Sequence, residues 1–318
     1  MTLREQNRAT LARQLLLERA DISAVEAIRA LAGLQAQEST GPYVALWSRL
    51  RDFDAAELTA AVEAREVLVA TLQRVTMHMV TAGDHRWLKP TLRPMLEQTR
   101  RRPGIREHDV DAIVAAARAL LPARMRDLRT LMPEGANPGH FTDLLQASLP
   151  LVRMPPAGTW RFAGSAVQEL AELGEPDSHV LVRRYLAAFG PATVRDAQAW
   201  SGLTKLAPVF AGLELEELDA GLFDLPGAPR PPADTPAPVR FLPRWDNVLI
   251  GYADRSRFGT YAVGDATVLV DGVAAATWRW SGDDVELSPP IPQAEEERGR
   301  LRDWLRCRSS DRTHMSHD

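Results

Sequence analysis

Residues 109–162 carry the strongest fold signal in the chain and read DVDAIVAAARALLPARMRDLRTLMPEGANPGHFTDLLQASLPLVRMPPAGTWRF. Apolar residues at helical spacing predict helices over Asp109–Leu121 and Met125–Leu131. A third helix, Pro138–Leu149, starts with proline in a position where the helix tolerates it. Strands are predicted at Leu151–Met154 and Thr159–Phe162, around a Pro-Pro turn. Helices followed by a two-stranded hairpin, the wing, are typical of a winged-helix unit.

The same order of elements is predicted upstream. Asp21 or Ser23 is expected to cap the second helix, and Gly41-Pro42 is expected to break the chain after it. The strands are predicted from β-branched and apolar residues. The predicted elements are the helix Leu3–Arg19, a helix carrying Val25, Ile28, Leu31 and Leu34, the helix Ala55–Arg65, and the strands Val67–Ala70 and Val75–Val80.

A third unit is predicted downstream. Gly190-Pro191 ends its first helix, and Ser201-Gly202 separates two short helices in a helix-turn-helix arrangement. Its predicted elements are the helices Ser178–Phe189, Thr193–Trp200 and Thr204–Leu213 and the strands Leu215–Leu218 and Leu222–Leu225.

The remainder of the chain reads as β structure. A stiff proline-rich linker, Pro226–Pro238, precedes it, and Asp271-Gly272 is a strong hairpin signal. A charged amphipathic helix, Glu295–Arg306, closes the fold. The predicted strands are Arg240–Leu242, Asn247–Gly251, Thr267–Val270, Val273–Trp280 and Val285–Leu287.

These patterns predict an α+β fold of three tandem winged-helix units followed by a β-rich segment and a closing helix. The expected boundaries are 1–105, 106–175 and 176–228 for the units, 229–308 for the β-rich region and 309–318 for a disordered polar tail. Three generic helical hairpins with ribbons are the alternative.

Composition indicates an ordinary globular protein. The 318 residues are 45% hydrophobic and 25% charged, with no run of 18 apolar residues. A single cysteine, Cys307, and the absence of a signal-like N-terminus favour a reducing cytoplasm. The net charge of -4 argues against a uniformly basic DNA-binding surface, but the cations are almost all arginine, which suits phosphate. Codon bias toward arginine explains the same composition.

No motif for metal or nucleotide chemistry is present. The seven histidines form no ligand spacing, and the sequence has neither a glycine-rich phosphate loop nor a nucleophile elbow. We therefore expect no metal and no cofactor.

One segment, Leu34-Gln35-Ala36-Gln37-Glu38, places two amides two residues apart, where the second helix is expected to end. Residues i and i+2 of a regular helix point to different sides, so both amides reach one site only if the helix breaks there. Spacing alone leaves open that Gln35 and Gln37 are surface residues or helix caps.

Four motifs together resemble a known family. They are Gly33-Leu34-Gln35-Ala36-Gln37, Arg74-Val75-Thr76-Met77-His78-Met79-Val80, Gly190-Pro191-Ala192-Thr193 with Trp200-Ser201-Gly202-Leu203, and Phe241-Leu242-Pro243-Arg244-Trp245-Asp246-Asn247. In this order they resemble the AlkZ-like winged-helix DNA glycosylases over roughly Leu3 to Trp304. The resemblance implies three winged helices around DNA and a catalytic Gln-x-Gln signature, matched here by Gln35 and Gln37.

The implied reaction is hydrolysis of the N-glycosidic bond of alkylated bases, N7-purine adducts or interstrand crosslinks, during base excision repair. An N7-alkylated purine is cationic and leaves without a general acid, so two amides that hold a water would suffice. Asp246 and Glu38 are the nearest carboxylate candidates, and His78 is a core residue or a support behind the glutamines. With no lysine near the motif, no Schiff base is expected.

The resemblance also implies a hairpin that probes the DNA groove. The candidate lies between Tyr252 and Val263, where Arg255, Arg257, Phe258 and Tyr261 cluster. A solvated hairpin is the alternative. The expected partner is double-stranded DNA carrying alkylated purines or crosslinks, bound by a cytoplasmic, nucleoid-associated monomer without membrane contact. A non-catalytic winged-helix DNA-binding protein or transcriptional regulator is the alternative function.

Overall fold

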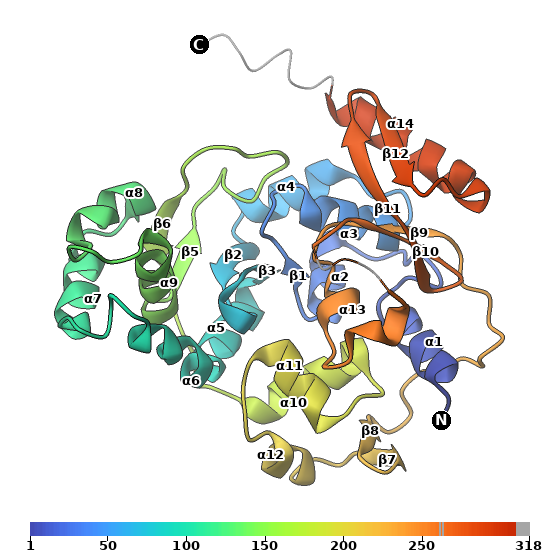
Figure 1. Ribbon diagram of the computed structural model, residues 1–318, viewed down its shortest axis with the longest axis horizontal. Helices are drawn as coiled ribbons and strands as arrows, with labels where there is room; N and C mark the ends of the chain where they lie inside the picture. Colours follow the sequence, from blue (N-terminus) through green and yellow to red (C-terminus); the bar gives the residue numbers. More distant parts are fainter. Residues whose placement is uncertain (261, 263, 310–318) are drawn as a thin grey trace.

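The computed structural model describes residues 1–260, 262 and 264–309, which form an α+β structure of helices and antiparallel sheets (Figure 1). Helices α7–α9 lie at one end, and α14 with strands β11 and β12 lies at the other. None of the helices in this described part combines the length and apolar character that a bilayer crossing needs.

The N-terminal region begins with two helices whose starts are fixed by capping boxes, Thr2 with Glu5 and Ser23 with Glu26. The first helix ends at Arg13, earlier than predicted. Gly41-Pro42 does not break the chain; it begins a buried helix, because proline fits the first helical turn. The elements are α1 (Leu3–Arg13), α2 (Ala24–Ala30), β1 (Leu34–Gln35), α3 (Gly41–Arg49), α4 (Ala55–Glu63), β2 (Val67–Thr71), β3 (Met77–Thr81), α5 (Ala82–Thr91) and α6 (Arg93–Leu96).

The middle region has the predicted helices, but its returning strand is not Thr159–Phe162. The strand that pairs with β5 is Val167–Leu170, because the intervening loop places Trp160 against Tyr43 and Trp304, with ring centroids 5.2 and 5.3 Å away. The elements are α7 (Val110–Ala119), β4 (Ala123–Arg124), α8 (Met125–Leu128), α9 (Pro138–Ser148), β5 (Leu151–Arg153) and β6 (Val167–Leu170).

One six-stranded sheet, in the order β1-β3-β2-β5-β6-β4, joins these two regions. Val69 of β2 lies opposite Arg153 of β5, so the strands predicted for two separate wings pair with each other across the expected boundary at residue 105. Both faces of the sheet are buried. Ala70 and Val80 face one apolar cluster, and Val69 and Met79 face the other.

The third region follows the prediction closely. Gly202 ends α11 with a φ of 80°, and a Cβ there would lie 3.0 Å from Met95 Cγ, so glycine is required both for the turn and for the close approach. The last predicted helix shortens to five residues. The elements are α10 (Ser178–Phe189), α11 (Val194–Ser201), α12 (Ala207–Ala211), β7 (Glu216–Asp219) and β8 (Leu222–Asp224).

The C-terminal region contains a four-stranded sheet, β12-β11-β10-β9, with the predicted turn at Asp271-Gly272. Residues 247–250 are a helix rather than a strand, because the Asp246 carboxylate accepts a hydrogen bond from Val248 N at 3.0 Å and caps it. Ser309 ends the last helix, and the remainder of the predicted tail lies outside the described residues. The elements are β9 (Arg240–Leu242), α13 (Asn247–Ile250), β10 (Thr267–Val270), β11 (Val273–Ser281), β12 (Asp284–Ser288) and α14 (Glu295–Ser309).

Candidate active site

Gln35 lies on the short edge strand β1 rather than at a helix end. α2 ends at Ala30, and Gly33, with a φ of 93°, turns the chain so that β1 pairs with β3. A Cβ on Gly33 would lie 2.7 Å from Val80 Cγ1, so only glycine allows this docking. Gln35 is directly opposite His78, and their side chains therefore share one face of the sheet.

Gln35 and His78 are buried with unpartnered polar atoms. Gln35 is 8% exposed, and neither its Oε1 nor His78 Nε2 has a hydrogen-bond partner. Gln73 and Asn247 also bury unpartnered side-chain atoms, and Asn247 Nδ2 donates to Gly33 O at 3.2 Å. Groups of this kind are rare in folded proteins and indicate a place where water or a ligand is received.

His78 is neutral. Burial, followed by the charge of Arg74, lowers the pKa of its imidazole to about 3. Its Nδ1–H donates to Thr76 O at 3.0 Å, which leaves Nε2 as an acceptor. His78 therefore acts as neither a general acid nor a source of positive charge near neutral pH.

Gln37 is exposed, and its side-chain amide continues the hydrogen bonding between β1 and β3 past the end of β1. Its Oε1 accepts a hydrogen bond from Met77 N at 3.1 Å, while Ala36 N donates to Met77 O at 2.8 Å. Gln37 lines a cavity of about 170 Å³ together with Val69 and Met79, which lie on the opposite face of the sheet from His78. The two glutamines thus share one segment, with Gln35 opposite His78 and Gln37 in the lining of the cavity beside Val69 and Met79, and no hydrogen bond between described residues joins them.

The two candidate carboxylates are held in ion pairs. The Asp246 oxygens accept hydrogen bonds from Arg49 at 2.8 and 2.8 Å, and both residues are buried. Glu38 pairs with Arg244 at 2.9 Å. Asp246 therefore joins α3 to α13, and neither carboxylate is in the unpaired state that suits a general base.

The hairpin conformation predicted between Tyr252 and Val263 is wrong over residues 255–258. Residues 255–258 form a 3₁₀ helix in which Arg257 and Phe258 are buried. Arg257 donates to Asn7 Oδ1 and Thr10 Oγ1, both at 3.0 Å, and so packs this segment on α1. Arg255 is exposed, and Tyr261 lies outside the described residues.

Arg74, for which the sequence predicts no role, lies near His78. It lies in the β2–β3 turn with a φ of 55°, next to Val75 at 60°, a strained conformation for a β-branched residue. The Arg74 guanidinium donates to Trp200 O, which connects the turn to α11. Burial, and then the charge of Arg255, lowers the pKa of Arg74 to about 10.

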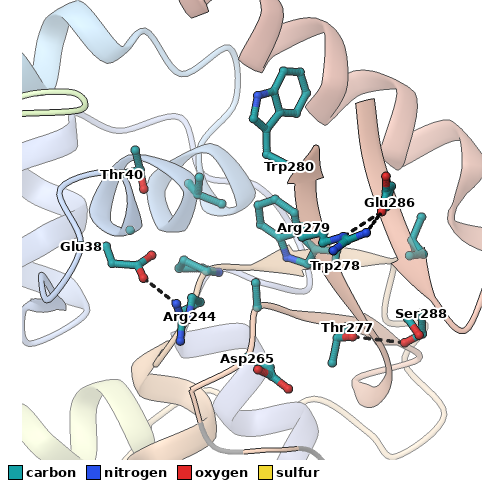
Figure 2. A pocket seen from close by; sticks show the side chains of 15 residues that line it. Glu38, Thr40, Arg244, Asp265, Thr277, Trp278, Arg279, Trp280, Glu286 and Ser288 are labelled. Atoms are coloured by element: carbon teal, nitrogen blue, oxygen red, sulfur yellow. Dashed lines mark hydrogen bonds and ion pairs between the residues drawn. The ribbon is translucent and has the colours of Figure 1, made fainter. Parts of the chain in front are cut away.

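A larger cavity, of about 850 Å³, is lined by Glu38, the residue after Gln37, among others (Figure 2). The Glu38–Arg244 pair forms one side and strands β11 and β12 form the other, with Trp278 and Trp280 between them. Trp278 Nε1 donates to Leu242 O at 2.8 Å, which holds that ring in place. Carboxylates lining the cavity outnumber arginines: Glu38, Asp265 and Glu286 against Arg244 and Arg279.

Among the residues that the structure describes, no group of histidine, cysteine, aspartate and glutamate side chains could hold a metal ion. The fold and this site define an α+β protein whose chemical groups are amides, a neutral histidine and paired charges.

Comparison with known proteins identifies the family. The model of the family described as "DNA glycosylase AlkZ-like" matches residues 28–306, so the chain belongs to the AlkZ-like DNA glycosylase family. A solved structure, Streptomyces sahachiroi DNA glycosylase AlkZ, has the same fold, with a TM-score of 0.72 and 18% identity over 90% of each chain. No curated protein sequence matches the chain significantly.

Proposed function

We propose that this protein is a monofunctional DNA glycosylase that hydrolyses the N-glycosidic bond of N7-alkylated purines, including bulky or crosslinked adducts, in double-stranded DNA. The observation that carries the proposal is the Gln-x-Gln segment itself. It places the exposed Gln37 in the lining of the smaller cavity, directly before Glu38 of the larger one, and keeps the buried Gln35 Oε1 without a partner two residues earlier. Family membership supports a DNA substrate, and we infer that the helical units act as tandem winged helices on it.

The reaction needs no general acid. The purine is already cationic, so when the C1′–N9 bond breaks, its electrons neutralise the leaving base. A water oxygen then bonds to C1′ and loses a proton to solvent. Gln37 Oε1 has a second lone pair for that water, and the unpartnered Gln35 Oε1, opposite His78, is an acceptor for a further water behind it. Their contribution is positioning, which suits a site where Glu38 and Asp246 are already paired.

The larger cavity suits the departing base. Its volume of about 850 Å³ falls in the range of sites that enclose drug-sized molecules, which supports bulky adducts. Two tryptophans and an excess of carboxylates favour a flat cationic group. A base turned out of the duplex would reach this cavity past Gln37.

Single-turnover excision from DNA containing N7-methylguanine, a bulky N7 adduct or a crosslink tests the proposal. We expect the native protein to leave abasic sites, and the Gln35→Ala, Gln37→Ala double variant to react about 100-fold more slowly or worse. Gln98→Ala, at an exposed glutamine outside both cavities, is the matched control.

Two results would overturn this function: no release of any base by the native protein, or full activity in the double variant. Sequence-selective footprints without base release would instead support the non-catalytic DNA-binding alternative. Borohydride should trap no covalent complex, since Lys89 is buried with its Nζ donating to Thr71 O and Gln146 O, at 3.0 and 2.6 Å.

A further inference from the structure

Arginines with buried, unpartnered nitrogens are few. In the described part of the chain they are Arg13, Arg74 and Arg153. Arg13 is neutralised by Asp224, with a nitrogen–oxygen distance of 2.7 Å, whereas neither Arg74 nor Arg153 has an ion pair with a described residue. Both of these unpaired arginines lie beside the Gln-x-Gln segment, on opposite faces of the sheet.

Arg153 shares the 170 Å³ cavity with Gln37. It lies at the end of β5 opposite Val69, and no described residue accepts a hydrogen bond from its guanidinium. Burial lowers the pKa of Arg153, which reports the cost of removing the charge from water. Buried Arg8 and Arg49 are paired with aspartates and buried Arg257 with neutral acceptors, whereas the partly buried guanidinium of Arg153 has neither kind of partner among the described residues.

The lining of this cavity is suited to an anion. None of its residues is acidic, in contrast to the larger cavity with its three carboxylates. The volume of about 170 Å³ corresponds to roughly five or six water molecules, enough for a phosphate group. Ser39 lines the same cavity and adds a hydroxyl donor.

We propose that Arg153 binds a backbone phosphate of the lesion-bearing strand in this cavity, immediately beside the sugar held at Gln37. The inference rests on the proposed function, because the phosphate belongs to the DNA on which that function acts. A partly buried, unpaired guanidinium is costly alone but forms strong, bidentate hydrogen bonds to a phosphate. The second helical region would thereby fix the register of the strand, and the first would supply the glutamines.

The test is the salt dependence of binding to an undamaged duplex, measured by fluorescence anisotropy. Each lost phosphate contact lowers the slope of log Kd against log salt by about one. We expect Arg153→Met to lose that increment and to bind about tenfold more weakly at 0.1 M salt, whereas Arg153→Lys keeps the slope. Arg129→Met, at an exposed arginine of the same region without an ion pair, is the control and should change the slope little.

Thermal unfolding provides the second readout. Because Arg153→Met removes an unpaired desolvated charge, we expect the Tm to stay equal or rise. A lower Tm together with an unchanged salt slope would show a structural role and overturn the proposal. So would equal effects of Arg153→Met and Arg129→Met. If Arg153→Met abolished competition by inorganic phosphate without altering DNA binding, the site would take free phosphate instead.

These measurements need no base excision, so they separate the two proposals. Native protein that binds DNA with the Arg153-dependent slope but releases no base would retain the phosphate site and refute the glycosylase. Excision that depends on the glutamines, in a protein whose salt slope does not depend on Arg153, would support the glycosylase and refute the phosphate site.

Discussion

The Arg49–Asp246 pair at the α3–α13 junction and the β1–β3 edge lie close together in the fold but treat polar groups in opposite ways. At the junction every guanidinium nitrogen of Arg49 is bonded, to Asp246, Gln14 O or Ala45 O. At the edge, Gln35, His78 and Gln73 bury polar atoms with no partner. The junction is therefore built for stability, while the edge keeps hydrogen-bonding capacity in reserve for a bound molecule.

Breaking the junction should have the largest effect on stability. Arg49→Met leaves Asp246 buried without its counterion, and we expect the free energy of unfolding to fall by about 3–5 kcal/mol in urea denaturation. The Arg49→Met, Asp246→Leu double variant should recover most of that loss. If the single variant were as stable as the native protein, the junction would not be the stabilising region we describe.

Acidification should act on buried histidines at and near the edge. Burial is the main cause that lowers the folded-state pKa of His78 to about 3 and of His85 to about 4, below the unfolded value of 6.5. The unfolded chain then binds more protons below pH 6.5, so stability falls as the pH drops toward those values. We expect a loss on the order of 2 kcal/mol per histidine between pH 7 and 4.5, measured by denaturation.

The non-titrating variant His85→Asn gives the control for this pH dependence, since it should reduce the loss of stability on acidification by about half. Equal stability at pH 7 and 4.5 in the native protein would mean that the two imidazoles are not held neutral.

The half-exposed Glu38–Arg244 ion pair beside the larger cavity should have the smallest effect on stability. Glu38→Gln breaks a half-exposed ion pair with Arg244, so we expect a stability change below about 1 kcal/mol. Excision should stay within about threefold of native between pH 6 and 8, because glutamines do not titrate. A loss of 100-fold in single-turnover excision would instead identify Glu38 as the base.

The elements predicted best were those whose periodicity is local. Helices α7, α9, α10 and α11 and the turn at Asp271-Gly272 were predicted to within a few residues, because capping residues, proline and glycine act on their immediate neighbours. The predictions failed where a distant contact decides the conformation. Trp160 packs on Tyr43 and Trp304 instead of joining a strand, and Arg257 packs on α1 instead of reaching solvent.

The same division holds for the site. The motif alone predicts Gln35 and Gln37, but the placement of Gln35 on β1, and of Gln37 just beyond it, depends on the close approach of Gly33 to Val80. Arg153 carries no local signal, since it becomes unusual only when β5 pairs with β2 and its Nε is buried without a partner.

The amino-acid sequence by itself determined the α+β class, most of the helices and the pair of amides from which we propose the catalytic site. Only the tertiary structure decided that two predicted wings join in one sheet, that Gln35 lies opposite His78 and that Gln37 lines a cavity. It also decided that the candidate carboxylates are neutralised while two arginines beside the motif are not. The physical reason is that helix formation depends on neighbours along the chain, whereas burial and charge pairing depend on residues brought together by folding.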